Sequence, residues 1–480
     1  MLEPVNQADV VVVGAGIAGL SAAHRLTSAG VRTAVLEAAP CVGGRMSTEK
    51  VDGFRLDRIG QLLFTSYPEL RLTPGLDALV LRTFAPGVVL HHDGRLHRVG
   101  APAGAGSARG ALNAVRALAA APRVTGMPRT TGMPRATGTP RTTAVPRSTG
   151  IPRGTGGPAT RPGARVLDIG APLRLRALLG RLATTPVERL LARPELPADQ
   201  ALTARGTPAR TVDGFLRPLL AALLCDPELT TSSRCADLAL RSFAGGRMCV
   251  PEGGAEALPE LLAAALPPGT VHTGVRVTSV STTSVTTAEH GEIRCRAVLL
   301  ATDARAAAEL LPGLRVPDFH PVTVVHHTTD EPPATGAALL LDADRGGPVA
   351  HTAVVSRVDP SRAPAGRALI SSTVLGTPPE GVDTAVRMHL SRLYGTSTHR
   401  WETLAVHHTP EAVPAMRPPH DLRRPVRLLA GLYVCGDHRD TSTVQGALHS
   451  AHRAASAILT DLGTGSMNRA EPLPTTRKAA

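Results

Sequence analysis

Two continuous apolar runs near the start of the chain are separated by a glycine-rich turn and a stretch that favours a helix. Val10 to Val13 is apolar at every position, which is typical of a strand buried on both faces of a parallel sheet. A second apolar run begins at Thr33 and ends at Glu37. This order predicts a strand, a helix and a second strand, the opening unit of an α/β fold built on a parallel sheet.

The turn after the first strand has glycines at the spacing of a dinucleotide-binding loop. Gly14 permits the tight turn, Gly16 lets the backbone approach a pyrophosphate, and Gly19 allows the helix to pack closely on the strand. Helix amides that begin near Gly16 then face the phosphates. Glu37 follows Gly19 at a distance suited to accepting hydrogen bonds from a ribose hydroxyl. The whole unit therefore predicts a dinucleotide site.

Other segments have patterns that predict single elements. Val88 to Val99 predicts a hairpin with Asp93 and Gly94 at its turn. The alternation from Val271 to Val280 predicts one strand, and Arg296 to Thr302 predicts a buried strand. From Leu173 to Leu191 a helix is expected, with one apolar face formed by Leu175, Leu178, Leu179 and Leu182.

A tandem hexad, R-x-T-G-x-P with one Ala in place of Gly, repeats six times from Arg123 to Pro158. Its prolines remove backbone donors and its glycines raise chain entropy, so a disordered or polyproline-like surface loop is expected. Arg123 to Arg165 contains eight arginines and no acidic residue, so +8 of the net charge of +13 lies in this segment. This uneven distribution argues against nucleic-acid binding by the protein as a whole. A basic tether for a membrane or polyanion stays open beside a loop without function.

No signal peptide is recognisable at the start, and no apolar run approaches the roughly 18 residues of a membrane span. A cytoplasmic protein is therefore expected. The leucine face between residues 173 and 191 has arginines outside it, a pattern that also occurs in helices that lie on membranes. Two interpretations therefore stay open for this face: packing in the protein core, and peripheral contact with the inner face of the membrane. Six scattered cysteines indicate reduced, mostly buried thiols and no zinc site.

After Glu37 the chain continues to Gly43, Gly44 and Arg45, where two glycines and a guanidinium suit a second approach to a diphosphate. From Asp9 to Arg45 the sequence resembles the FAD-binding start of the superfamily of amine oxidases, protoporphyrinogen oxidases and phytoene desaturases. The resemblance implies FAD as the cofactor.

The resemblance continues to the end of the chain. Gly431 to Ile458 is similar to the second flavin-contacting motif of that superfamily, which implies that Gly436 and Asp437 meet the ribityl and diphosphate part and that Val444, Gln445 and Gly446 begin a helix aimed at the flavin pyrimidine. Such a helix start stabilises negative charge on the reduced ring. Pro251 to Leu262 resembles the glycine pair and helix that return the chain to the cofactor domain, and Val277 matches a position whose backbone binds adenine.

The resemblance implies a discontinuous, Rossmann-like two-dinucleotide-binding-domain FAD fold with an α+β substrate domain. We expect FAD-binding segments at 1–75, 251–310 and 418–463, substrate-domain segments at 76–250 and 311–417 with a disordered insert at 104–165, and a disordered tail at 464–480. The expected cofactor contacts are Gly14, Gly16, Ile17, Ala18, Gly19, Glu37, Ala38, Gly43, Gly44, Arg45, Gly60, Gln61, Val277, Gly436, Asp437, Val444, Gln445 and Ala447.

The chemistry is less well defined. Many amine-oxidising relatives hold a water beside the flavin with a lysine, but the two lysines here, Lys50 and Lys478, lie at implausible positions. The resemblance then favours hydride removal from a lipophilic or conjugated small molecule, in an apolar pocket that needs no acid or base. Flavin-dependent amine oxidation, and a flavoprotein that only supports isomerisation or binding, remain alternatives.

Few residues stand out as chemical groups. His438 follows the Gly436 turn and is a candidate for proton handling. The paired histidines at 91 and 92, 326 and 327, and 407 and 408 indicate no metal site, because neighbours on a strand point to opposite faces. A single glycine-rich unit gives no sign of an NAD(P)H domain, so oxygen, a quinone or another carrier is expected to accept the electrons.

Overall fold

The computed structural model describes residues 8–99 and 170–463. The hexad repeat, Lys478 and the expected tail all lie outside these residues.

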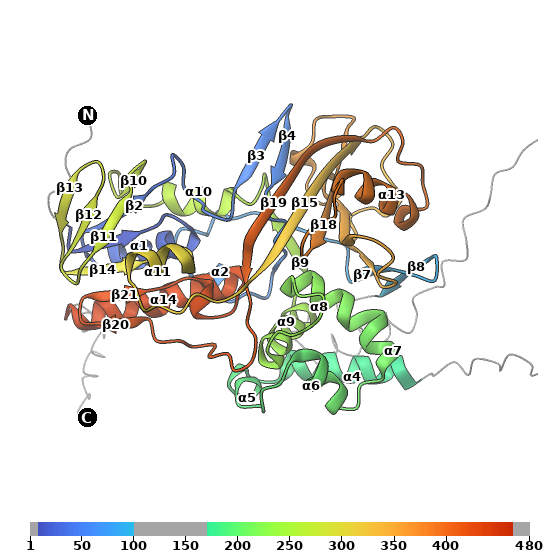
Figure 1. The fold of residues 1–480 in the computed structure, drawn as a ribbon, viewed down its shortest axis with the longest axis horizontal. Helices are drawn as coiled ribbons and strands as arrows, with labels where there is room; N and C mark the ends of the chain where they lie inside the picture. Colours follow the sequence, from blue (N-terminus) through green and yellow to red (C-terminus); the bar gives the residue numbers. More distant parts are fainter. Residues whose placement is uncertain (1–7, 100–169, 464–480) are drawn as a thin grey trace, which may run out of the picture.

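A six-stranded sheet forms the centre of one half of the molecule (Figure 1). Its strands, in spatial order, are β10 (Val271–Thr273), β2 (Thr33–Glu37), β1 (Val10–Val13), β14 (Ala297–Leu300), β21 (Leu432–Val434) and β20 (Arg427–Leu429). Every neighbouring pair is parallel except β20 with β21. Segments from the start, middle and end of the chain thus interleave in one sheet.

The two faces of this sheet have different covers. Val10 and Val12 belong to the core that also holds α1 (Ile17–Ser28), α10 (Ala257–Ala264) and α14 (Val444–Asp461). Val11 and Val13 pack instead with the small sheet of β11 (Val277–Val280), β12 (Ser284–Thr287) and β13 (Gly291–Arg294) and with the end of α11 (Ala304–Leu310). Because side chains alternate along a strand, a fully apolar β1 is what two covered faces require.

The second half of the molecule is built on a seven-stranded, mostly antiparallel sheet (Figure 1). Its order is β19 (Glu402–Pro414), β15 (Phe319–Thr329), β18 (Ala368–Leu375), β17 (Val349–Val354), β16 (Leu340–Asp342), β7 (Val88–His92) and β8 (Arg95–Val99). The expected hairpin is confirmed as β7 and β8, with Asp93 and Gly94 both in the left-handed region. One face packs against α13 (Val382–Tyr394).

Helices occupy the space below this sheet in Figure 1. They are α4 (Gly170–Thr184), α5 (Val187–Leu191), α6 (Ala198–Ala204), α7 (Ala209–Thr211), the π-helical turn η1 (Val212–Leu216), α8 (Arg217–Leu224) and α9 (Ser233–Gly245). The remaining elements are β3 (Thr48–Val51), β4 (Phe54–Asp57), β5 (Leu63–Phe64), α2 (Glu69–Leu72), β6 (Leu81–Thr83), β9 (Met248–Pro251), α12 (Val355–Val358), η2 (Pro360–Arg362) and η3 (Asp437–Arg439).

Two expectations about single elements are wrong. Residues 271 to 280 form two strands in different sheets, β10 and β11, because Gly274 adopts a φ of 73° that breaks the run. Residues 173 to 191 form two helices, α4 and α5, because Pro186 sits between them.

The leucine face of α4 belongs to the protein core. Leu179 is 3% exposed and Leu182 is 1% exposed, and the partly buried Leu175 and Leu178 pack against the same cluster, which also contains α9 residues. The buried part of this face is therefore covered by the protein itself, while Leu175, Leu178 and Leu182 also border a cavity of about 700 Å³. In the described part of the chain, no helix is long and apolar enough to cross a membrane.

All six cysteines are free thiols, as expected. Cys235, Cys249 and Cys435 are buried, Cys225 and Cys295 are partly buried, and Cys41 is exposed.

Candidate functional site

An elongated cavity of about 650 Å³ runs along the carboxyl end of the parallel sheet. At one end it is bordered by Glu37 and by residues 275–278 at the start of β11, and in the middle by the loops after β1 and β2. At the other end lie Ile59, Gln61 and the start of α14. Ligands of open α/β sheets bind at this edge, and the volume of the cavity lies within the range of small-molecule and cofactor sites.

The glycines of the first turn meet the requirements of such a site. Gly14 has a φ of 106°, which favours glycine. A Cβ on Gly16 would touch no protein atom within 4 Å, so this backbone is open toward the cavity. A Cβ on Gly19 would lie 2.0 Å from the Gly14 carbonyl oxygen, so only glycine lets α1 approach the turn. The first turn of α1 therefore begins directly beside the cavity, which Ile17 and Ala18 line.

Glu37 fixes the loop beside the cavity. Its carboxylate accepts hydrogen bonds from the Ala15 amide at 2.7 Å and from the Ala39 amide at 2.8 Å, while the residue lines the cavity. A carboxylate oxygen has room for more than one hydrogen bond, so these contacts leave acceptor capacity for a ribose hydroxyl.

Arg45 and Asp437 join the two glycine motifs across the middle of the cavity. The guanidinium donates to Asp437 at 2.6 Å and to the Ala412 carbonyl oxygen at 2.9 Å. Burial alone would lower the pKa of Arg45, but the Asp437 carboxylate outweighs this effect and raises it. A permanent cation therefore borders the glycine turns at Gly43, Gly44 and Gly436, where a diphosphate needs charge compensation.

Most of the expected cofactor contacts line this one cavity. They are Gly14, Gly16, Ile17, Ala18, Glu37, Ala38, Gly43, Gly44, Arg45, Gln61, Val277, Gly436, Asp437, Val444 and Ala447. Gly19 supports the turn from below, and Gly60 lies near the Thr373 hydroxyl, outside the cavity lining. Gln445 lines a neighbouring cavity, where its side-chain oxygen accepts a hydrogen bond from the Glu69 amide at 3.0 Å.

His438 does not border the cavity. Its side chain is buried and its ring packs against Gly436. Burial lowers the pKa of His438 to about 4, so the imidazole is neutral at pH 7. The structure therefore gives it no position from which to exchange protons with a ligand in this cavity.

Sequence reasoning missed several residues of the lining. Asp303 caps α11 by accepting hydrogen bonds from the amides of Arg305 and Ala306, and it lines the cavity; its position directly after a buried strand was a usable signal. Ala412 and Val413, at the end of β19, carry no local signal because tertiary contacts alone bring this long strand to the cavity.

His91 and His92 converge on one carboxylate and do not separate as expected for neighbours on a strand: their Nδ1 atoms lie 3.2 and 2.8 Å from the two oxygens of Asp344. His91 forms a group with Asp342 and Asp344, whereas His92 forms another with Asp93 and Asp344. Asp342 is already held by the Gly346 amide at 2.7 Å and by His389 at 3.2 Å. These contacts are those of a structural ion-pair cluster between β7 and the loop after β16, so we assign no metal role to it.

Comparison with known proteins defines the class. The family of flavin-containing amine oxidoreductases matches residues 17–459, so the chain belongs to this family. The expected fold, an α/β FAD fold with two domains, is confirmed, and the protein is an FAD-dependent oxidoreductase.

Individual relatives are similar over shorter stretches. Putrescine oxidase from Kocuria rosea is 43% identical over 100 residues, 20% of each chain, and carotenoid 3,4-desaturase from Haloarcula japonica is 55% identical over 49 residues, 10% of each chain. The matched stretches thus span a fifth or less of these curated relatives. An oxidoreductase from Methanosarcina mazei has the same fold, with a TM-score of 0.65 at 16% identity over 92% of this chain and 99% of its own.

Proposed function

We propose that the protein uses FAD to remove a hydride from a small lipophilic or conjugated molecule, as a desaturase or oxidase. The observation that carries the proposal is the set of apolar side chains in the part of the cavity toward α14, where Met46, Ile59, Ala412, Val413 and Val444 line it beside the polar Gln61 and Thr443. Bound FAD would accept the hydride, while these side chains would exclude water from the flavin ring.

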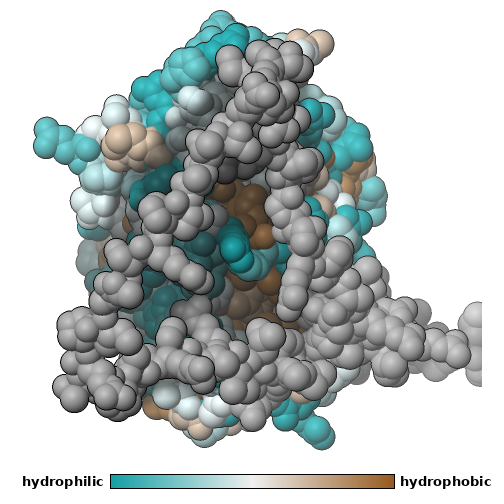
Figure 2. All heavy atoms as spheres, turned by 90° about the vertical axis from the view of Figure 1, so that its right-hand side faces the viewer, coloured by the Kyte–Doolittle hydropathy of each residue, from teal (hydrophilic) through white to brown (hydrophobic). Residues whose placement is uncertain are grey.

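The position of the lysines supports the same proposal. Lys50 forms an ion pair with Glu256 at 2.9 Å on β3 and does not line the cavity, and no lysine lines it within residues 8–99 and 170–463. A lysine-held water beside the flavin is therefore not part of the proposed chemistry. Figure 2 shows the side of the molecule on which α13 and β8 lie, where both hydrophobic and hydrophilic residues are exposed.

In this proposal the residues named above hold FAD, with Glu37 on the ribose, Arg45 and the glycine turns on the diphosphate, and the start of α14 at the pyrimidine. The domain division expected from the sequence is part of the same proposal. The FAD segments contain the strands of the parallel sheet, and the substrate segments contain the strands of the seven-stranded sheet. Oxygen, a quinone or another carrier would accept the electrons.

Amine oxidation is the second candidate, and a specific observation favours it. The cavity beside the start of α14 is bordered by the buried carboxylates of Glu69 and Asp440, which pair with His452 and with His449 and Arg453, and a cationic group could compete for them. Arg241 and Arg423 line the same cavity. The short identities with putrescine oxidase on one side and a carotenoid desaturase on the other leave both substrate classes open.

Anaerobic mixing of the FAD-loaded protein with a carotenoid, a porphyrinogen and benzylamine tests the proposal. Bleaching of the flavin by the carotenoid or the porphyrinogen, but not by benzylamine, is the expected result. Bleaching by benzylamine alone would overturn the proposal in favour of amine oxidation. Bleaching by none of the three at saturating concentrations would contradict both.

A further inference from the structure

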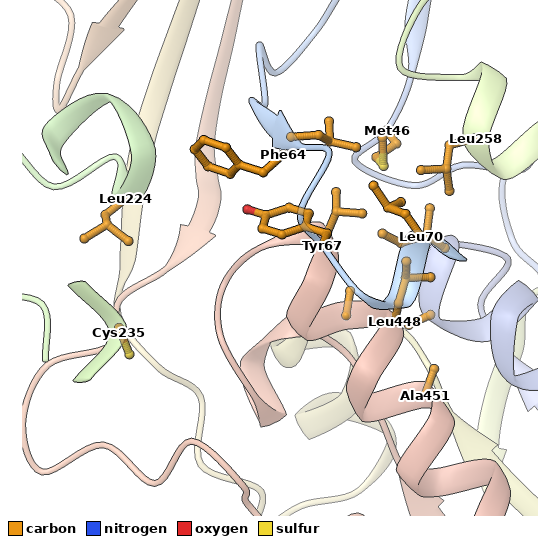
Figure 3. Close-up of a cluster of buried hydrophobic side chains, with 14 of the residues drawn as sticks. Met46, Phe64, Tyr67, Leu70, Leu224, Cys235, Leu258, Leu448 and Ala451 are labelled. Carbon is orange, nitrogen blue, oxygen red and sulfur yellow. The ribbon is translucent and has the colours of Figure 1, made fainter. Parts of the chain in front are cut away.

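A second cavity of about 290 Å³ adjoins the flavin end of the first one. The two cavities share Thr443, the N-cap residue of α14. Figure 3 shows the space from one side, with Tyr67 facing across it to Leu224 and Cys235, and all three residues line the second cavity. A ligand bound there would lie next to the end of the cofactor cavity.

The first two turns of α14 separate the two cavities. Val444 and Ala447 line the cofactor cavity, whereas Gln445 and His449 line the second one. Successive residues are about 100° apart around a helix, so residues 445 and 449 share one face and residues 444 and 447 share the neighbouring face. The helix that would contact the flavin therefore also presents an amide and an imidazole to the second cavity.

His449 is oriented by a carboxylate. Its Nδ1 lies 2.8 Å from Asp440 Oδ2, and Asp440 is itself held by the Thr441 amide at 2.9 Å. A carboxylate on Nδ1 selects the tautomer with the proton on that nitrogen and leaves Nε2 as an acceptor. Because the His449 side chain is 33% exposed and lines the cavity, Nε2 is accessible to a ligand.

Most of the opposite wall is apolar. Leu224, Cys235, Leu238 and Ala239, from α8 and α9, line it together with Met416, and Arg241 and Ser242 border the cavity further along α9. Burial raises the pKa of the Cys235 thiol well above its usual range, so this side chain stays neutral and behaves as a small hydrophobic group. One wall therefore suits an apolar body and the other a polar head.

We propose that the second cavity is the substrate-binding site, with the apolar body of the substrate on the α8 and α9 wall and its hydroxyl or amine group donating a hydrogen bond to Nε2 of His449. The cavity volume is near the lower end for small-molecule sites, so the bound portion is compact. This proposal rests on the proposed function in one respect: the proposed function is what makes the molecule bound in the second cavity the substrate. His449 binds the substrate in it, and Asp440 acts as a positioning residue.

Binding without turnover tests the site. The FAD-loaded protein is titrated with benzyl alcohol and with ethylbenzene, which have the same shape but differ in one hydroxyl group, and chemical shifts of ¹⁵N-labelled histidines are followed by NMR. Benzyl alcohol is expected to shift the His449 signals. In His449→Leu its affinity is expected to fall about fivefold or more, the loss of one hydrogen bond, while that of ethylbenzene holds or rises.

Two further variants control the experiment. His452 lies on the same side of α14 and also pairs with a carboxylate, Glu69 at 3.4 Å, but does not line the cavity, so His452→Gln is expected to keep the affinity for benzyl alcohol within twofold. Ala239→Leu adds bulk to the α9 wall of the cavity and is expected to weaken both ligands. Each variant counts only if its flavin absorbance matches that of the parent.

The proposal is overturned if benzyl alcohol does not bind the parent protein at 50 mM, a limit of about 1.8 kcal/mol of binding free energy. It is also overturned if Ala239→Leu or His449→Leu leaves its affinity unchanged. Failure of the proposed function has a different signature, in which benzyl alcohol binds with the expected dependence on His449 while no carotenoid or porphyrinogen bleaches the flavin.

Discussion

Replacing Arg362 by methionine removes the centre of a buried ion network that joins β4, β9 and η2. The guanidinium is 2% exposed and contacts Asp57 through Nη1, Asp359 at 3.1 Å through Nε, and the Pro251 carbonyl oxygen at 2.9 Å through Nη2. Asp57 and Asp359 come from different halves of the sequence, so the arginine fixes the cofactor side of the molecule against the substrate side.

The expected loss of stability follows from the burial of the two acids. Methionine fills a similar volume but leaves two buried carboxylates without their cation, which costs about 3–5 kcal/mol in comparable cases. Burial alone would raise the pKa of Asp359, but hydrogen bonds from Ser361 and Gly253 and the charge of Arg362 outweigh this effect and lower it. The carboxylate is thus ionised at pH 7 in the parent protein, and the substitution removes one of the groups that keep it so.

Thermal unfolding of the FAD-loaded protein at pH 7 measures the effect. At about 2 °C per kcal/mol for a large domain, Arg362→Met is expected to lower Tm by about 6–10 °C. The control is Arg305→Met, which removes the exposed ion pair with Glu411 and is expected to leave Tm nearly unchanged. Equal, small shifts in the two variants would refute the reasoning, because burial would then make no difference to the pair.

Three further predictions concern the cofactor site and pH. Gly16→Ala should fold but lose FAD, because its Cβ would extend only into the cavity. Gly19→Ala should give less folded protein, because its Cβ would clash with the backbone of the first turn. Equal FAD content in the two purified variants would contradict this prediction. Arg45→Met should weaken FAD binding about tenfold in a fluorescence titration of the apoprotein, with partial recovery in Arg45→Lys, and an unchanged Kd would speak against a diphosphate contact. Burial lowers the pKa of His326, His351 and His438 to about 4, so below pH 6.5 the unfolded chain binds more protons than the folded one. Tm should therefore be maximal above pH 6.5 and fall toward pH 4. A Tm that does not change with pH in this range would exclude this role for the three histidines.

The first and last motifs could be predicted because their signals are local. The apolar run of β1, the positive φ at Gly14 and the close approach at Gly19 each restrict a single position to a few residue types. Gly43, Gly44 and Arg45 lie in the same cavity because the turn after β2 returns them to the first turn, where Gly43 pairs with Gly16.

The features that the sequence did not predict depend on tertiary contacts. The alternation from residue 271 to 280 is genuine, but Gly274 turns the chain from one sheet into another. The leucine face of α4 has the same pattern whether a membrane or α9 covers it, and only the fold decides between them. Asp440 and His449 are nine residues apart, with a loop and a helix start between them, so no spacing rule brings them together.

The absorption spectrum of the purified protein, before and after denaturation, tests the central claim most directly. The account predicts flavin bands in the native protein and release of free FAD, in about one equivalent per chain, on unfolding. A protein that shows no flavin bands and binds no FAD on reconstitution, although it is folded by circular dichroism, would contradict the assignment of the 650 Å³ cavity to the cofactor.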